Sequence, residues 1–325
     1  MVRDALTLIA AAALLTACGI GRLAGGQLAL INGQVRLDRA IEREQDPERR
    51  RLLAEVPEIR RFAAESVGLF PGKSYTGYYE TEAKGLTYVV TACERLRLEP
   101  YAWWFPVAGR VEYRSYWDEE DAIAEARDLE AQGYDTWISP SRAYSTLGFF
   151  RDPVITTMLR DGLPALVDVL VHELAHARLY VPGHTDWNES LASFVGERGA
   201  ELYFQAQRFD GSPYREEVTA RAQRKAVFDQ LVATAGQRLE QLYASSRPDA
   251  DKLREREAIF VRLQTDIVRV FPKESPETWR MNNARIVHFI RYSANSGRLE
   301  ALWKRSGQNF RKFWTLAEEY SDQLD

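Results

Sequence analysis

The sequence predicts an α+β fold in which helices predominate, and three observations lead to this prediction. Residues 86–96 and 111–117 are rich in Thr, Tyr and Val, and the second run alternates in the way that half-buried strands do. Within residues 161–203, apolar segments then follow with helical character. Beyond Arg208 the chain keeps helical apolar spacing between charged residues, and Gly and Pro are sparse. We therefore expect a small sheet followed by many helices.

Composition limits the possible functions without selecting one. The chain has 325 residues, of which 45% are hydrophobic and 28% are charged, as in an ordinary globular protein. This length allows one large domain or two smaller ones. The formal net charge is −4, so we expect no nucleic-acid partner.

The first 17 residues have the features of a signal peptide. An apolar run from Ala5 to Leu15 follows a short basic start, and it is too short to span a bilayer, which needs about 20 residues. The ending L-T-A-C at Cys18 resembles the bacterial lipobox, in which the cysteine is lipidated and becomes the first mature residue. With Gly19 next, this resemblance implies an envelope lipoprotein anchored in the outer membrane and facing the periplasm. An uncleaved anchor or a plain signal peptide is the alternative.

The mature chain then divides by composition. Residues 18–34 are small and Gly-rich, as in a tether, and residues 35–69 show an amphipathic helical pattern that Pro47 and Pro57 are expected to divide. We place a catalytic core at 35–208. Cys93 lies in an apolar run and is expected to be a buried structural thiol.

The predicted sheet occupies the first half of this core. After the strand at 111–117, Asp118 starts a helix that Gly133 ends, and residues 134–138 form another strand. Beyond the core, residues 209–325 form a helical C-terminal region packed on it. Its expected helices are 214–245, 251–270, 281–292 and 298–320.

The segment that carries chemistry is H-E-L-A-H at 172–176, in a helix without a breaker until Pro182. His172 and His176 lie one turn apart on one helix face, so both imidazoles can bind a single metal ion. Glu173 is 100° around the helix, where a carboxylate can activate water without ligating the metal. The sequence thus predicts one zinc ion per chain, with Glu173 as general base. A pair of surface histidines is the alternative.

Glu189 is the expected third ligand, on a second helix that runs from about residue 188 to 205. Its helix face carries only small side chains, which allow the two helices to approach closely. These residues are Ala192, Ser193, Gly196 and Ala200. Asp186 as N-cap, with Glu189 closing a capping box, is the alternative role for this carboxylate.

Two further residues stay open as contributors to the metal site. His184 is a possible third imidazole, although the spacing does not match the longer metzincin motif, and we expect it at the rim. Asp168 lies one turn before His172 and either orients that imidazole or only faces the helix dipole.

Several ordered blocks resemble a family of predicted bacterial zinc aminopeptidases, many of which look like lipoproteins. The blocks are A-Y-S-T-L-G-F-F-R-D-P-V-I-T-T-M-L (143–159), H-E-L-A-H, N-E-S-L-A-S-F-V-G (188–196), P-V-A-G (106–109) and N-N-A (282–284). The resemblance implies a zincin-like fold and peptide substrates. The N-E-x-x-A block is also similar to the third-ligand motif of thermolysin-like gluzincins, which supports Glu189. Those enzymes place the ligand glutamate 18 or more residues after the second histidine, whereas only 12 residues separate His176 from Glu189 here. The sequence also contains no G-x-M-E-N block, the exopeptidase motif that recognises a free α-amino group.

In zincin peptidases the edge strand of the sheet pairs with the extended substrate, and residues 143–150 are our candidate for that strand. Tyr144, Gly148 and Tyr292 are candidates for contacting the substrate or the oxyanion, with His288 as a further one. We expect a zinc-dependent peptidase, in line with the aminopeptidase family. The alternatives are a non-catalytic envelope lipoprotein with a structural zinc site and a chaperone-like peptide binder.

Overall fold

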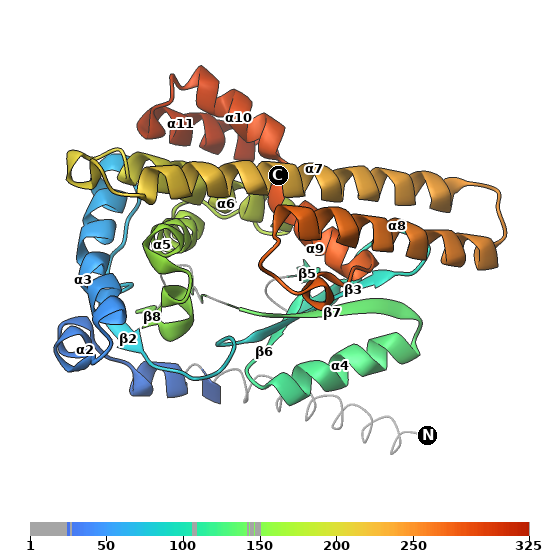
Figure 1. Cartoon of the computed structure of the whole chain (residues 1–325), viewed down its shortest axis with the longest axis horizontal. Helices are drawn as coiled ribbons and strands as arrows, with labels where there is room; N and C mark the ends of the chain where they lie inside the picture. Colours follow the sequence, from blue (N-terminus) through green and yellow to red (C-terminus); the bar gives the residue numbers. More distant parts are fainter. Residues whose placement is uncertain are drawn as a thin grey trace, which may run out of the picture.

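The computed structural model describes residues 25–26, 28–105, 109–141, 143, 146 and 151–324, and it is mostly helical with small sheets (Figure 1). The strands are β1 (Val35–Arg36), β2 (Gly77–Tyr79), β3 (Tyr88–Glu94), β4 (Trp103–Phe105), β5 (Gly109–Val111), β6 (Arg114–Tyr116), β7 (Tyr134–Pro140) and β8 (Val154–Ile155). The α-helices are α2 (Leu37–Arg43), α3 (Pro47–Phe62), α4 (Glu119–Ala131), α5 (Gly162–Arg178), α6 (Thr185–Tyr203), α7 (Tyr214–Ala244), α8 (Asp249–Val270), α9 (Asn283–Ser293), α10 (Ser296–Arg305) and α11 (Phe310–Ser321). A π-helical turn, η1 (Ala63–Val67), and three 3₁₀ turns, η2 (Thr156–Leu159), η3 (Gln207–Phe209) and η4 (Pro276–Trp279), complete the described elements. The α+β prediction is confirmed at this level.

Among the described residues, the strands form three small sheets in the orders β1-β2-β8, β6-β3-β7 and β4-β5. The predicted strand at 111–117 is wrong as a single element. Val111 ends β5 and pairs with Trp103 of β4, whereas β6 pairs with β3. The two halves of the alternating run therefore join different sheets, which local alternation does not reveal. The helix that follows, α4, ends at Ala131, and Gly133 just beyond its C-cap has a φ of 93°, the left-handed conformation that favours glycine.

The N-terminal part differs from the expectation in two ways. Residues 28–33 are helical rather than a loose tether, and Leu30 is only 2% exposed within the core. Pro57 lies inside α3 instead of dividing it. Its side chain is exposed, while Leu53 and Ile59 on the other face are completely buried. Packing of that face offsets the backbone hydrogen bond that proline removes.

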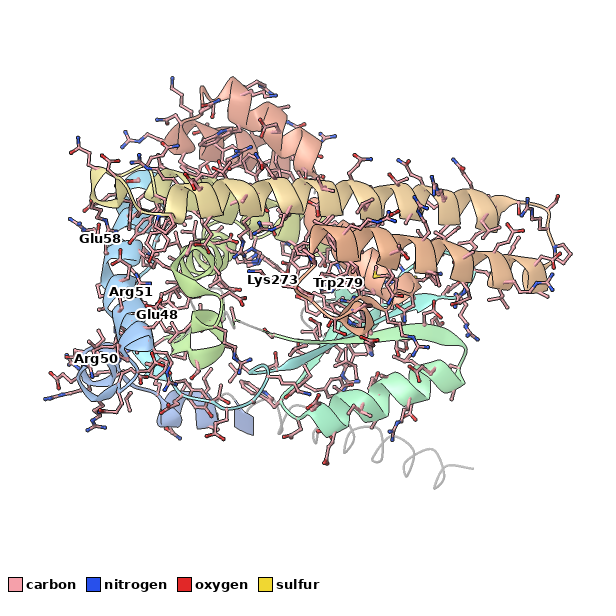
Figure 2. All side chains as sticks on the ribbon, in the orientation of Figure 1. Glu48, Arg50, Arg51, Glu58, Lys273 and Trp279 are labelled. Carbon is pink, nitrogen blue, oxygen red and sulfur yellow. The ribbon has the colours of Figure 1, made fainter. Side chains whose placement is uncertain are left out.

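The charged side of α3 is solvated, as expected from its sequence. Glu48, Arg50 and Arg51, which are labelled in Figure 2, are all exposed. Arg51 pairs with Glu48 one turn earlier at 2.5 Å. Exposed pairs of this kind contribute little to stability, so the buried face of α3 decides where the helix lies.

The predicted helix at 298–320 is two helices, because the chain turns between α10 and α11. Gly307 and Gln308 both have positive φ, at 68° and 60°. Phe313 and Trp303 of these helices pack in one core with α3, α5 and α6. The Nε1 atom of Trp314 donates to the backbone oxygen of Val67 at 2.8 Å. The C-terminal helices thus cover the outer side of α6 and the end of α3.

A second core joins α7, α8 and α9, in which α7 and α8 form a long antiparallel hairpin (Figure 1). Arg256 of α8 binds Asp135 of β7 through two hydrogen bonds of 3.0 and 2.9 Å, and both side chains are buried. Helix α9 lies between this hairpin, the β3–β7 sheet and α6. Within the described part of the chain, no helix is both long and apolar enough to cross a membrane.

Candidate functional site

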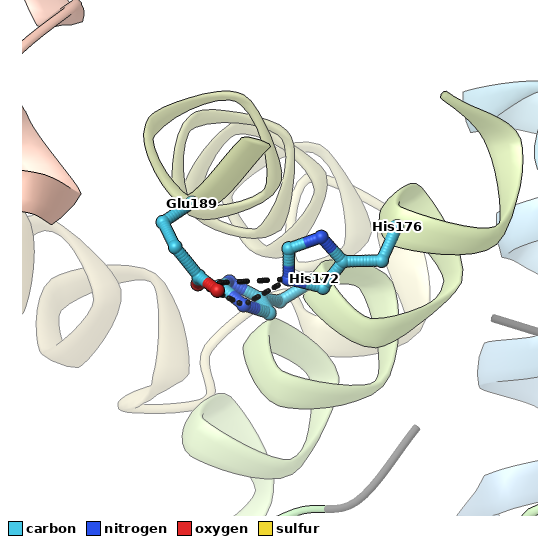
Figure 3. A group of neighbouring side chains, drawn as sticks. All are labelled: His172, His176 and Glu189. Carbon is cyan, nitrogen blue, oxygen red and sulfur yellow. Dashed lines mark hydrogen bonds and ion pairs between the residues drawn. The ribbon is translucent and has the colours of Figure 1, made fainter. Parts of the chain in front are cut away.

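The site is built on α5 and α6, which pack side by side. Helix α5 buries an apolar face that includes Leu166, Leu170 and Leu174, so its polar face turns toward the inside of a cavity. His172 and His176 lie on this polar face, and Glu189 of α6 points toward their imidazoles (Figure 3).

The three side chains converge closely enough to share one metal ion. The two Nε2 atoms of His172 and His176 are 3.1 Å apart, and the Oε2 atom of Glu189 is 3.6 Å from each of them. Tetrahedral zinc bonds of about 2.0–2.2 Å place ligand atoms about 3.3–3.6 Å apart. The two distances from Glu189 match the spacing of ligands around zinc, and the distance between the two Nε2 atoms is about 0.2 Å shorter. Two imidazoles with one carboxylate are ligand types that zinc accepts.

The protonation states of the metal-ligating side chains depend on one another. Burial alone lowers the pKa of His172, but the nearby carboxylates of Glu189 and Glu173 outweigh it and raise the pKa to about 9. Burial would raise the pKa of Glu189, whereas the nearby imidazoles of His176 and His172 hold it well below its usual range. Without a metal, the group thus favours a proton on His172 and an ionised Glu189 carboxylate. A dication placed between the three atoms replaces that proton.

Glu173 lines the same cavity and has a different electrostatic environment. Burial raises its pKa, and the neighbouring His172 and His176 counteract this only in part. A carboxylate with a raised pKa accepts a proton more readily than an ordinary glutamate does. This property is useful for a general base.

Glycines set the distance between the two helices. A Cβ atom built on Gly196 would lie 2.9 Å from the backbone oxygen of Asp168 and 3.3 Å from the Cβ of His172. On Gly199 it would lie 2.8 Å from a methyl of Val171. A larger residue at either position would push α6 away from α5. The small face predicted along α6 is therefore the contact that brings Glu189 to the histidines.

Helix α6 begins at Thr185, three residues earlier than expected, so Glu189 lies beyond the first turn. Its N-cap is His184, and no side chain caps the helix start. The capping box with Asp186 is therefore absent, and Asp186 faces Arg291 instead, at 3.6 Å from its Nε atom. His184 does not belong to the ligand group and does not line the cavity.

A residue that the sequence reasoning missed holds the short connection between the helices. The buried amide of Asn188 accepts a hydrogen bond from the backbone N–H of Val181 and donates one to its carbonyl, both at 2.8 Å. This bidentate contact keeps the loop closed immediately before Glu189. The short H-x12-E spacing is the sequence signal that a special loop was needed.

The ligand group opens into a cavity of about 610 Å³ between the helices and the sheet. Val89 of β3, Ser115 of β6 and Ser139 of β7 line one wall. The predicted edge strand at 143–150 falls largely outside the described residues, as do Tyr144, Gly148 and the lipidation candidate Cys18; Ala143 lines the cavity.

Helix α9 forms the opposite wall. Tyr292 lines it, and burial raises its pKa well above the usual value, so the phenol keeps its proton. Burial and the charge of Arg291 lower the pKa of His288 to about 3, which keeps this imidazole neutral.

Tyr113 and Arg291 also reach this wall and were not predicted. Burial raises the pKa of Tyr113, and Glu189 adds to the effect. Arg291 is 2% exposed, and its Nη2 atom lies 3.2 Å from Glu112. Only the tertiary fold brings the loop before β6 and helix α9 to the same place.

Asp168 has a role besides orienting His172 or facing the helix dipole. Its carboxylate accepts a hydrogen bond from Arg221 of α7 at 3.0 Å. Its charge still contributes to the raised pKa of His172. Asp168 thus connects the site to α7.

Comparison with known proteins gave one match. Residues 20–324 match the sequence profile of a family described as "Putative aminopeptidase". Neither the curated proteins nor the solved structures contained a significant match to this chain.

Proposed function

The chain belongs to the family described as "Putative aminopeptidase", and from this premise we propose that it is a zinc-dependent aminopeptidase. The observation that carries the proposal is the group of His172, His176 and Glu189, whose ligand atoms are 3.1 and 3.6 Å apart. Two imidazoles and one carboxylate form the donor set of catalytic zinc sites in peptidases.

When bound, zinc lowers the pKa of water and polarises a peptide carbonyl. The residues of this chain have separate roles around it. Glu173 takes the proton of the attacking water and passes it to the leaving amine, because its raised pKa suits both steps. The protonated phenols of Tyr113 and Tyr292 are available as hydrogen-bond donors on the other side of the cavity.

A structural zinc site is the rival from another class, and it requires four protein ligands. Among the described residues the group has three members, and neither His184 nor Asp186 is one of them. This count favours an open coordination position, as catalysis requires. Zinc binding should therefore be lost in Glu189→Ala and kept in His184→Ala, measured by metal analysis after dialysis. Loss in His184→Ala with retention in Glu189→Ala would overturn the ligand assignment.

The experiment that tests the activity is zinc-dependent hydrolysis of peptides by the wild-type chain and by Glu173→Gln. We expect the variant to bind zinc normally and to lose at least about a hundredfold in kcat, the usual range for a general base. Full activity in Glu173→Gln would refute the mechanism. Peptides with free and acetylated N-termini separate aminopeptidase from endopeptidase action, since an aminopeptidase cleaves only the free ones.

We also propose that Cys18 carries a lipid that anchors the chain in the outer membrane of a bacterial envelope. The support is the L-T-A-C ending after an apolar run. In Cys18→Ser we expect the protein to move from the membrane fraction to the periplasmic fraction. If the variant stays in the membrane fraction, the lipid anchor is refuted.

A further inference from the structure

The cavity continues past the metal-ligating group toward α7. Glu197 lies eight residues beyond Glu189 on α6, which is about 12 Å along the helix axis at 1.5 Å per residue. Asp168 lies against this stretch of α6, because a Cβ built on Gly196 would be 2.6 Å from its Oδ1 atom and 3.3 Å from the Cβ of His172. Small side chains leave space along this part of the cavity. They are Ser193, Ala200 and Ala222.

We define the α7 subsite as Asp168 and Glu197 together with Arg221 and Lys225 of α7, which all line the cavity. Asp168 is paired with Arg221 at 3.0 Å. Lys225 is shared, because its Nζ atom lies 2.5 Å from Asp229 and 3.2 Å from Glu197. Three carboxylates, those of Asp168, Glu197 and Asp229, therefore contact the two cations. The contact of Lys225 with Glu197 is longer than its contact with Asp229.

Glu197 is also the member of the subsite that remains open to a ligand. Its neighbours enclose it, yet 32% of its side-chain surface is accessible where it lines the cavity. Burial raises the pKa of Glu197 to about 7 even though the charge of Lys225 lowers it, so a second cation beside this carboxyl group would stabilise its ionised form. A cation that enters the cavity can engage Glu197 while Lys225 stays bound to Asp229.

We propose that the α7 subsite binds a cationic group of the peptide substrate, an ammonium or a guanidinium, and that Glu197 selects for it. This inference rests on the proposed peptidase function. The α-amine next to a scissile bond is too close to the metal group to reach Glu197, since one extended residue spans about 3.5 Å. The cation is therefore either a Lys or Arg side chain near the scissile bond or the N-terminus of a peptide cleaved two to three residues inward.

The test compares the zinc-loaded full chain on peptides that contain either lysine or Nε-acetyl-lysine, each with a free or an acetylated N-terminus. We expect kcat/KM to be about tenfold higher when the cation is present, which corresponds to about 1.4 kcal/mol. The pair of peptides whose rates differ identifies the source of the cation, side chain or N-terminus. In Glu197→Gln the ratio of the two kcat/KM values should fall to about one.

Two more variants separate selection from a structural effect. Lys225→Gln removes the internal competitor of the ligand, so the preference for the cationic peptide should increase, opposite to the effect of Glu197→Gln. Glu300→Gln is the matched control. Glu300 of α10 pairs with Arg198 of α6 at 2.8 Å and is 34% exposed, but it does not line the cavity. The control should leave the ratio unchanged.

Equilibrium binding distinguishes failure of this inference from failure of the proposed function. Fluorescence anisotropy with the labelled peptides is measured on Glu173→Gln and on Glu173→Gln/Glu197→Gln. Tighter binding of the cationic peptide that depends on Glu197 supports the subsite even if no peptide is hydrolysed. Equal binding and equal hydrolysis of cationic and neutral peptides would overturn the subsite and leave the peptidase function intact.

Discussion

Replacing Gly196 by alanine should separate the two helices that carry the metal-ligating residues. The added Cβ would lie 2.9 Å from the backbone oxygen of Asp168, whereas ordinary van der Waals contacts begin at 3.4 Å. A backbone oxygen cannot rotate away, so α6 has to withdraw by about 0.5 Å at this point. Glu189, two turns earlier on the same helix, moves away from the histidines with it.

The expected change in stability follows from two opposing terms. Overpacking of a close contact costs about 1–3 kcal/mol, and replacing glycine by alanine inside a helix gains up to about 1 kcal/mol. Gly297→Ala in α10 is the matched control, because a Cβ there meets no atom within 4 Å. The difference between the two variants isolates the cost of the clash, about 1–3 kcal/mol.

Urea unfolding of the metal-free chain, followed by circular dichroism, measures this difference, and competition with a chelator measures the zinc affinity. We expect Gly297→Ala to equal or exceed the stability of the wild type with unchanged zinc affinity. Gly196→Ala should be less stable than Gly297→Ala and should bind zinc at least about tenfold more weakly. If Gly196→Ala is as stable as the control and binds zinc as tightly as the wild type, the helix contact does not position Glu189.

Three further predictions concern the supports of the site. Asn188→Ala leaves the buried N–H of Val181 without its partner, while the Val181 carbonyl keeps the N–H of His184 at 3.2 Å, and should lower the free energy of unfolding by about 1–3 kcal/mol; urea unfolding checks this, and a loss below about 0.5 kcal/mol would contradict it. Arg256→Ala leaves the buried carboxylate of Asp135 without its bidentate partner and should lower the free energy of unfolding by about 3–5 kcal/mol. Urea unfolding measures this loss, and an unchanged unfolding midpoint would show that the pair does not hold α8 against β7. Glu197 has a folded-state pKa of about 7, above the ordinary 4.5, so its contribution to stability falls as pH rises from about 4.5 to 7. Glu197→Gln removes this pH-dependent contribution, so the stability of the variant relative to the wild type should increase between pH 5 and pH 8. A difference in the free energy of unfolding that stays constant over this range would show that this carboxyl titrates normally.

Local patterns predicted the parts of the fold that depend on neighbours in sequence. The strands at 88–94 and 134–140 and the left-handed Gly133 agree with the sequence prediction. Errors occurred where packing overrode the local pattern. Pro57 stays inside α3 because the opposite face is buried, and the alternating run at 111–117 is divided because its halves pair with different strands.

The same distinction holds for the candidate site. The positions of His172 and His176 on one helix face follow from 3.6 residues per turn, so the sequence alone determined that their imidazoles would lie together. Whether Glu189 reaches them depends on how closely α6 packs on α5, which the tertiary structure decides through Gly196 and the Asn188 clamp. Helical periodicity in the sequence does not predict these contacts between residues of different elements.

The far walls of the cavity depend on tertiary structure even more strongly. Tyr113 and Arg291 are 178 positions apart in the sequence, yet the Arg291 guanidinium lies 5.6 Å from the centre of the Tyr113 ring. Glu197 lies about two turns beyond Glu189 on α6, and it has a place in the cavity only because α7 packs over it with Lys225. A one-dimensional pattern specifies which face of a helix is polar, whereas long-range packing determines what that face meets.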